Sequence, residues 1–160
     1  MIRPVNTSHA SELCEIYNHY IKNTIITFEE KEVSVDDMKE RIIQATQKLP
    51  WIVYIENDRV IGCAYASEWK SRCAYKFSVE TTIYIHPEFG GKGIGSILYE
   101  ELISKLKKLD LHAVIGGIAV PNEASVALHK KFGFEKVGQF KEVGFKLNKW
   151  IDVEYWELIF

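Results

Sequence analysis

A glycine-rich segment past the middle of the chain most constrains the fold and the chemistry. It runs from Gly90 to Ser96, after a strand-like run over residues 81–86 and into a helix-like run over residues 94–109. Glycines at such a junction let the backbone turn tightly and expose N–H groups at the start of the helix, where a phosphate or pyrophosphate binds. Glycine-rich turns also close ordinary strand–helix connections, so the segment indicates either an anion receptor or a plain turn.

Two common phosphate-binding motifs do not fit this segment. A P-loop places a lysine and then a Ser or Thr after its last glycine, whereas Lys92 lies inside the glycine cluster. A dinucleotide fingerprint follows the first strand of a βαβ unit and has an acidic residue about 20 positions later, which this chain lacks. An ATPase and a dehydrogenase are therefore excluded, and another nucleotide-type ligand remains.

Composition limits the class of protein further. The 160 residues, 47% of them hydrophobic, suit one domain with a sizeable core, and a net charge of −2 gives no reason to expect nucleic-acid or membrane binding. No apolar run is long enough to cross a membrane, and the first residues do not begin a secretory signal. Cys14, Cys63 and Cys73 are odd in number and lack C-x-x-C spacing, which indicates reduced thiols and no zinc site. We expect a cytoplasmic protein that binds no metal, nucleic acid or membrane.

The hydrophobic pattern predicts strands and helices that are mixed along the chain. The predicted strands cover residues 2–5, 51–56, 59–67, 75–86, 112–119, 134–146 and 150–158. The predicted helices lie around residues 13–21, 38–43, 94–109 and 122–132. Ser8 or Ser11 is the expected cap of the first helix, and Asn57-Asp58 is expected to form a tight hairpin turn. This order predicts an α/β fold with a central sheet flanked by helices.

The order of these parts resembles the GNAT superfamily of acyl-CoA-dependent N-acetyltransferases. The pyrophosphate loop of that family has the pattern Q/R-x-x-G-x-G/A, and residues 90–95 fit it except that Gly90 stands at the Gln or Arg position. The resemblance implies a single GNAT domain over residues 1–160. It implies a central twisted mixed sheet of about six to seven strands flanked by about four helices, with acetyl-CoA as co-substrate.

A narrower resemblance covers nearly the whole chain. Short segments are similar to phosphinothricin acetyltransferases, a family that includes enzymes acting on methionine sulfoximine and methionine sulfone. These segments are residues 16–20, 27–29, 50–51, 64–67, 72–75, 79–80, 121–122, 128–129 and 150–153. The resemblance implies acetyl transfer to the α-amine of a small amino acid. It also implies a homodimer with its pocket near the interface, where Trp69, Tyr75 and Trp150 are either contacts or parts of the monomer core.

The resemblance assigns cofactor-binding residues. Backbone groups of Ile83, Tyr84 and Ile85 would pair with the pantetheine amides as an added strand does, and an N–H near Ile85 would polarise the thioester carbonyl. The remaining cofactor contacts would come from Gly91, Lys92, Gly93, Ile94, Gly95, Ser96, Asn122 and Lys131. The alternatives are core-facing isoleucines, a helix N-cap at Asn122 and solvated surface lysines.

Glu80 is the candidate general base. It interrupts the strand immediately before the cofactor-binding segment, where apolar or hydroxyl residues would suit a sheet better. A free carboxylate with a pKa of about 4.3 accepts a proton from an ammonium group only if burial raises that pKa or an ordered water relays the proton. The alternative is a solvated strand carboxylate or a salt-bridge partner.

His129 is the second candidate catalytic residue. The superfamily commonly has N-x-x-A-x-x-x-Y on this helix, with a tyrosine that often donates a proton to the departing CoA sulfur. Here Asn122, Ser125 and His129 occupy the pattern, and their spacing puts Asn122 and His129 on one helix face. An imidazole with a pKa of about 6.5 suits a proton donor or a second base, and a structural histidine is the alternative.

The resemblance also implies acceptor-binding residues. These are Phe28, Trp69, Arg72, Cys73, Ala74 and Tyr75. An α-amino acid with a phosphinate or sulfoximine side chain presents a carboxylate and a tetrahedral polar group. The planar guanidinium of Arg72 suits recognition of a carboxylate or a phosphinate. Alternatively, Lys70, Arg72 and Lys76 form an ordinary solvated basic patch.

The sequence thus predicts an enzyme that acetylates a small amino acid of the phosphinothricin, methionine sulfoximine or methionine sulfone class. Direct attack in a ternary complex is expected, because Cys73 has no paired base in the local sequence that would make it an acyl-enzyme nucleophile. Two alternatives stay open. One is a GNAT enzyme for another amine, such as a protein N-terminus, a polyamine or an aminoglycoside. The other is a non-catalytic acyl-CoA sensor.

Overall fold

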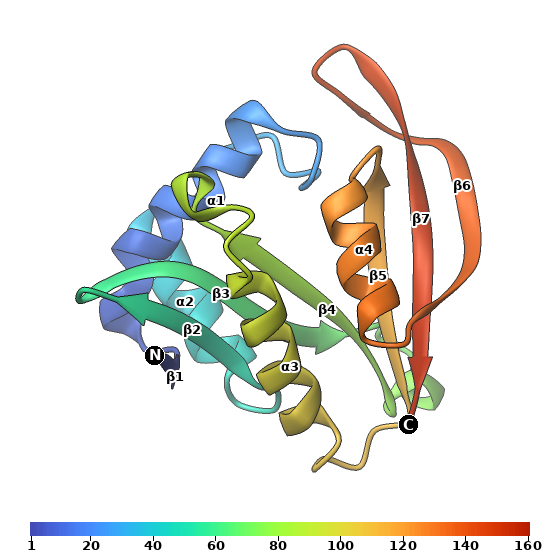
Figure 1. Ribbon diagram of the computed structural model, residues 1–160, viewed down its shortest axis with the longest axis horizontal. Helices are drawn as coiled ribbons and strands as arrows, with labels where there is room; N and C mark the ends of the chain where they lie inside the picture. Colours follow the sequence, from blue (N-terminus) through green and yellow to red (C-terminus); the bar gives the residue numbers. More distant parts are fainter. The chain divides into compact units, whose positions relative to one another are not determined.

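The computed structural model describes the whole chain, residues 1–160. Seven strands form one mixed sheet in the order β1-β2-β3-β4-β5-β7-β6. The strands are β1 (Ile2–Pro4), β2 (Trp51–Glu56), β3 (Arg59–Glu68), β4 (Ser78–Ile85), β5 (Ala113–Val120), β6 (Glu135–Lys146) and β7 (Lys149–Ile159). The helices are α1 (Ala10–Asn23), α2 (Val35–Ala45), α3 (Ile94–Leu106) and α4 (Glu123–Lys131) (Figure 1). The predicted α/β class and mixed sheet are confirmed.

The first of two compact units comprises Met1–Asn18, Val33–Ser67 and Thr82–Leu109. In this unit α3 packs against β2, and its Leu98, Tyr99 and Leu102 side chains are completely buried. β2 and β3 form an antiparallel hairpin. Its turn residues, Asn57 and Asp58, have φ of 50° and 58°, the left-handed conformation that a tight two-residue turn requires. The predicted hairpin is therefore confirmed.

The second unit comprises His19–Glu32, Glu68–Thr81 and Asp110–Phe160. Here β7 pairs antiparallel with β5 on one side and β6 on the other, and α4 packs against β5 (Figure 1). The β6 ladder is interrupted between Phe140 and Gly144, so residues 141–143 form a bulge. The Asp152 carboxylate of β7 braces the bulge by accepting hydrogen bonds from the Glu142 N–H and from Gln139 Nε2, each over 2.8 Å. The bulge thereby sets the register of the last part of β6.

The parallel ladder between β4 and β5 is short. It joins residues 78–80 to residues 113–115, and its last pair is Glu80 with Ile115. β5 continues beyond this pair, because β7 stays hydrogen-bonded to it as far as Val120. Glu80 therefore lies where the pairing of β4 with β5 stops.

Two predicted boundaries were wrong. The strand predicted over residues 75–86 begins only at Ser78, because Cys73–Tyr75 form a 3-10 turn that ends in a helical, not an extended, conformation. The helix predicted to end at residue 109 ends at Leu106. Leu109 is exposed in the following turn, so it does not extend the buried stripe of α3.

The cap at the start of the first helix was also predicted wrongly. Neither Ser8 nor Ser11 supplies it. The side chain of Asn6 accepts a hydrogen bond from the Ser8 N–H over 2.9 Å and caps a short 3-10 turn, Thr7–His9, that leads into α1. Asparagine is a favoured cap, and the additional turn moves the capping position ahead of the point where the hydrophobic pattern begins.

Candidate active site

The predicted anion receptor lies at the start of α3, in the first unit. Gly91 and Gly93 have φ of +75° and +80°, which residues with side chains rarely adopt. A Cβ at either position would meet no atom within 4 Å, so the backbone conformation, and not crowding, requires these glycines. Ser34 and Asn122 cap α2 and α4 through their side chains, whereas Gly93 offers no side chain to the first N–H groups of α3. Such N–H groups suit an anion.

β4 contains the predicted pantetheine-binding segment. Ile83 and Ile85 are half-buried, whereas Tyr84 is buried, with its ring centroid 5.2 Å from that of Tyr17. This alternation is the one expected of a strand. A Cβ on Gly95, in the first turn of α3, would lie 3.7 Å from Ile83 Cδ1, an ordinary van der Waals distance. Ile83 therefore lies beside the glycine turn.

Lys92 and Lys131, the predicted phosphate ligands, both lie over aromatic rings. Lys92 Nζ is 4.5 Å from the ring centroid of Phe89, and Lys131 Nζ is 5.8 Å from that of Phe132. Each ammonium group thus stacks on a neighbour from its own segment. The alternative of surface lysines accounts for these contacts, and a role toward a phosphate stays a prediction.

Glu80, the predicted base, is half-buried at the end of the β4–β5 ladder. Burial raises the pKa of its carboxyl above the usual value, because the charged form loses solvent. The carboxylate forms no hydrogen bond or salt bridge, so the alternative of a salt-bridge partner does not apply. A carboxylate with a raised pKa and unused acceptor capacity meets the requirements of a general base.

A tyrosine that the sequence pattern did not reveal lies beside Glu80. A Cβ at Gly117 would lie 3.0 Å from Glu80 Oε1 and 3.4 Å from Tyr155 Cε1, so this glycine leaves space for both side chains. Burial, together with the charge of Glu80, raises the pKa of the Tyr155 phenol. The Tyr155 ring makes edge contacts with Trp69 and Phe140, each at a centroid distance of 5.6 Å. Tyr155 is recognised as a neighbour of Glu80 only from the pairing of Gly117 with Tyr155 between β5 and β7. That strand register cannot be read from the sequence.

His129, the second predicted catalytic residue, is buried in α4. Its Nδ1 lies 2.8 Å from the Ser125 carbonyl oxygen, which only accepts, so we assign the imidazole proton to Nδ1. The ring packs edge-on against Phe134 at a centroid distance of 4.9 Å. Burial lowers the pKa of the imidazole, and the hydrogen bond to Ser125 partly opposes this. Asn122 accepts from the Ser125 N–H over 3.1 Å, as the helix cap that was its alternative role.

The two predicted catalytic side chains lie on opposite faces of β5. A Cβ at Gly116 would overlap the His129 imidazole, whereas a Cβ at Gly117 would approach Glu80. Consecutive residues of a strand point to opposite faces. His129 is therefore not placed to act as a second base beside Glu80, and a proton donor or a structural residue remains.

The predicted acceptor-binding residues form two groups in the second unit. In the first group, Lys70 Nζ lies 5.4 Å from the ring centroid of Trp69 and 5.8 Å from that of Tyr75. Three further predicted residues follow Trp69 and precede Tyr75 in the sequence, and all three are exposed: Arg72, Cys73 and Ala74. Phe28 lies apart from this group, and its ring rests on Gly144 of β6. Trp69 connects the first group to Tyr155 and so to the surroundings of Glu80.

Comparison with known proteins decides the family. A family model described as an acetyltransferase (GNAT) domain matches residues 2–155. The chain is a GNAT acetyltransferase. A phosphinothricin N-acetyltransferase of Streptomyces coelicolor is 38% identical over 160 residues, which cover 98% of this chain and 94% of that protein. An L-methionine sulfoximine/L-methionine sulfone acetyltransferase of Salmonella typhimurium is 32% identical, with 98% of this chain and 92% of that protein covered.

A solved structure shows the same relationship. The crystal structure of a GNAT superfamily phosphinothricin acetyltransferase from Sinorhizobium meliloti, in complex with acetyl-CoA, is 35% identical to this chain. The two superpose with a TM-score of 0.96 over 99% of this chain and 87% of that one. The predicted resemblance to phosphinothricin and methionine sulfoximine acetyltransferases is confirmed, as is the prediction of an N-acetyltransferase.

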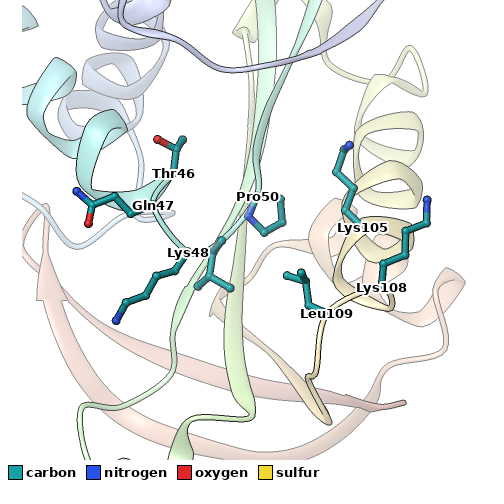
Figure 2. Close-up of a pocket in the computed structure, with 8 residues that line it drawn as sticks. Thr46, Gln47, Lys48, Pro50, Lys105, Lys108 and Leu109 are labelled. Carbon is teal, nitrogen blue, oxygen red and sulfur yellow. The ribbon is translucent and has the colours of Figure 1, made fainter.

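A pocket in the first unit of this GNAT acetyltransferase is lined by none of the predicted catalytic, cofactor-binding or acceptor-binding residues. It has a volume of about 340 Å³ and lies at the C-terminal ends of α2 and α3, lined by Thr46, Gln47, Lys48, Leu49, Pro50, Lys105, Lys108 and Leu109. Figure 2 shows that the ammonium group of Lys48 points away from those of Lys105 and Lys108. Because its polar groups do not converge, this pocket is not the candidate active site.

The GNAT acetyltransferase also has no group of three or more His, Cys, Asp or Glu side chains that could hold a metal ion. None of its helices combines the length and the apolar character needed to cross a membrane.

Proposed function

We propose that the chain transfers an acetyl group from acetyl-CoA to the α-amine of a small amino acid. The acceptor class is phosphinothricin, methionine sulfoximine or methionine sulfone, and the amine attacks the thioester directly while both substrates are bound. The names of the relatives support this class, and one observation carries the chemistry: Glu80 is a half-buried carboxylate with a raised pKa and no ion-pair partner. Residues 1–160 act as one domain in this proposal.

Acetyl-CoA fits the start of α3 in this chain. The first-turn N–H groups have no side-chain cap, and the left-handed Gly91 and Gly93 leave the backbone there uncovered, which suits a pyrophosphate. Backbone groups of residues 83–85 would bind the pantetheine chain, and the N–H near Ile85 would polarise the thioester carbonyl. When bound, acetyl-CoA supplies the activated acetyl group.

Glu80 acts as the general base in the proposed mechanism. The acceptor arrives as an ammonium ion, and Glu80 accepts one of its protons, either directly or through a water, which frees the lone pair that attacks. Burial helps because a raised carboxyl pKa lies closer to that of the ammonium group. Tyr155 and Trp69 cover the neighbourhood of this carboxylate with aromatic surface. The sulfur leaves as a thiolate and takes its proton from solvent; His129 would supply that proton only as an imidazolium, from Nε2, because its neutral ring keeps its proton on Nδ1.

Arg72 is proposed to bind the anionic groups of the acceptor. It is exposed and forms no salt bridge with an acidic side chain, so its guanidinium is available for two parallel hydrogen bonds to a carboxylate or phosphinate. Trp69 and Tyr75 provide the apolar wall on this side. A polyamine or aminoglycoside would instead call for acidic residues at these positions.

We also propose that the enzyme works as a homodimer. Large apolar side chains are exposed along the β6–β7 hairpin: Val137, Phe140, Val143, Phe145, Leu147 and Trp150. Such a concentration on one element is typical of an interface. Trp150, the most exposed of them at 64%, is the natural test position. Sedimentation should show a dimer that Trp150→Glu converts to monomers, and a monomeric wild-type protein would contradict this part of the proposal.

Thiol release from acetyl-CoA tests the proposed function. Phosphinothricin, methionine sulfoximine, methionine sulfone, spermidine and a peptide with a free N-terminus are supplied as separate acceptors. Turnover confined to the amino-acid analogues supports the proposal. Turnover with only the polyamine or the peptide keeps the family and rejects the acceptor class. Binding of acetyl-CoA without turnover of any acceptor favours a sensor.

A further inference from the structure

We propose that Lys146 and Gly144 of β6 position Phe28 against the acceptor amino acid and thereby set the affinity for acceptors. The two β6 residues are buried on the same face of the strand, near its end, while Phe145 between them is exposed. Phe28 belongs to residues 24–32, the segment that follows α1. The inference deepens the proposed function and rests on it for the identity of the acceptor.

Lys146 is a buried lysine that the catalytic chemistry does not use. Only 4% of its surface is exposed, and its Nζ donates hydrogen bonds to the carbonyl oxygens of Thr27, over 2.7 Å, and Tyr20, over 3.4 Å. Burial lowers the pKa of this ammonium group, and the charge of Glu30 opposes that shift. A buried ammonium is retained where its hydrogen bonds are made, so Lys146 ties the backbone directly before Phe28 to β6.

Gly144 provides the surface on which Phe28 rests. A Cβ at this position would overlap the Phe28 ring, so only glycine allows the ring to lie against the β6 backbone. Gly144 follows the bulge at residues 141–143, which sets the register that places it there. Phe28 as a whole residue is nevertheless 43% exposed. One side of Phe28 is thus fixed by β6, and the other is open to a ligand.

The segment around Phe28 is ordered by its own side chains as well. Thr24 Oγ1 donates to the Tyr20 carbonyl oxygen over 2.8 Å and accepts from the Ile26 N–H over 3.1 Å. The Tyr20 carbonyl oxygen therefore receives hydrogen bonds from both Thr24 and Lys146. A segment held in this way gives Phe28 a defined position, and a preorganised aromatic wall binds a small acceptor at lower entropic cost than a mobile one.

Two variants test the inference, each with a matched control on the same hairpin. Lys146→Met removes the ammonium group and keeps an unbranched stem, and its control is Lys149→Met, an exposed lysine that pairs with Lys146 across the turn. Gly144→Ala displaces the Phe28 ring, and its control is Gly138→Ala, where a Cβ meets nothing within 4 Å. The readouts are amide hydrogen exchange of residues 24–32 and steady-state kinetics with acetyl-CoA and methionine sulfone.

For Lys146→Met we expect exchange in residues 24–32 to be at least about tenfold faster, and the acceptor KM to rise about tenfold. The KM for acetyl-CoA and kcat should stay within about twofold, because the positioning of Phe28 by Lys146 acts on acceptor binding alone. Gly144→Ala should raise the acceptor KM similarly. Both controls should match the wild-type protein.

Unchanged exchange in Lys146→Met, or an unchanged acceptor KM in both test variants, would overturn the inference. So would an equal loss of kcat and of affinity for acetyl-CoA, which indicates general damage to the fold. If the wild-type protein acetylates no amino acid, the proposed function fails, and the exchange measurement still decides whether Lys146 holds the segment.

Discussion

The two faces of β5 hold different kinds of side chain, although a glycine leaves space for a neighbouring side chain on each face. On one face Gly116 receives the imidazole of His129, which is buried and hydrogen-bonded to its own helix. On the other face Gly117 leaves space for Glu80 and Tyr155, a carboxylate without an ion pair and a phenol beside it. The first face is closed by packing, and the second holds titratable groups with unused hydrogen-bonding capacity.

The comparison shows that burial and a shifted pKa do not by themselves identify a catalytic group. His129 is the more buried of the two residues and its pKa is lowered, yet its Nδ1 proton is committed to the Ser125 carbonyl. Glu80 is only half-buried, and its oxygens are available to a substrate. Availability for hydrogen bonding separates the two, which makes Glu80 the stronger candidate.

The largest expected effect comes from removing the carboxylate. Glu80→Gln should lower kcat/KM by about 10²–10⁴-fold, the usual contribution of a general base, with the affinity for acetyl-CoA retained. In the wild-type enzyme, kcat/KM should fall as the pH drops through the raised pKa of Glu80, because the protonated carboxyl cannot accept the ammonium proton. Initial rates of thiol release across pH measure both.

The same variant carries a stability control. Burial disfavours the charged form of Glu80, so Glu80→Gln should be at least as stable as the wild-type protein at pH 7. This difference should vanish below about pH 4.5, where the wild-type carboxyl is protonated in the folded and unfolded states alike. Undiminished turnover by the variant would remove Glu80 from the mechanism.

Gly116→Ala should damage the closed face of β5. Its Cβ would overlap the buried His129 ring, so we expect the free energy of unfolding to fall by about 1–3 kcal/mol, as for other overpacked cores. Urea unfolding measures this loss. The kcat per folded molecule should change by less than about threefold; a loss as large as that of Glu80→Gln would instead identify His129 as the proton donor.

Gly117→Ala should show the opposite pattern on the open face. Its Cβ would lie 3.0 Å from Glu80 Oε1, the end of a flexible side chain that can move aside. The free energy of unfolding should therefore change by less than about 1 kcal/mol, while displacement of the base lowers kcat/KM roughly tenfold. Equal effects of the two alanine variants on stability and on rate would contradict the distinction between the faces.

The smallest expected effect is the pH dependence of stability that His129 contributes. Because burial lowers its pKa from the usual 6.5, the unfolded state binds the proton more readily than the folded state. The stability of the wild-type protein should therefore decrease as the pH falls below about 6.5. His129→Gln should have a flatter pH profile in urea unfolding between pH 7 and 5, and an unchanged slope would show that another group is responsible.

Features fixed by local backbone chemistry were predictable from the sequence. Asn57-Asp58 form the hairpin turn because both residues tolerate a left-handed conformation, and Gly91 and Gly93 adopt that conformation ahead of α3. The sequence correctly predicted the stripe of buried apolar side chains on α3, except at Leu109, which lies beyond the end of the helix. In each of these cases the determining residues are neighbours in the chain.

Features that depend on strand register were not predictable. Tyr155 lies next to Glu80 only because β7 pairs Tyr155 with Gly117, and a shift by one residue would turn it to the other face. Lys146 reaches the backbone before Phe28 only because of the preceding bulge in β6. Gly116 and Gly117 look equivalent in the sequence, and their different roles follow from which side chain approaches each one.

The bulge in β6 has a consequence for the behaviour of the protein in solution. β6 is the last strand of the sheet, it is 12 residues long, and Val137, Phe140 and Phe145 are exposed along it. A straight apolar edge of this length would template pairing with strands of other molecules and promote aggregation. The irregularities at Val137 and at residues 141–143 break that edge into three short runs. The bulge that places Gly144 under Phe28 should therefore also hinder pairing of β6 with strands of other molecules.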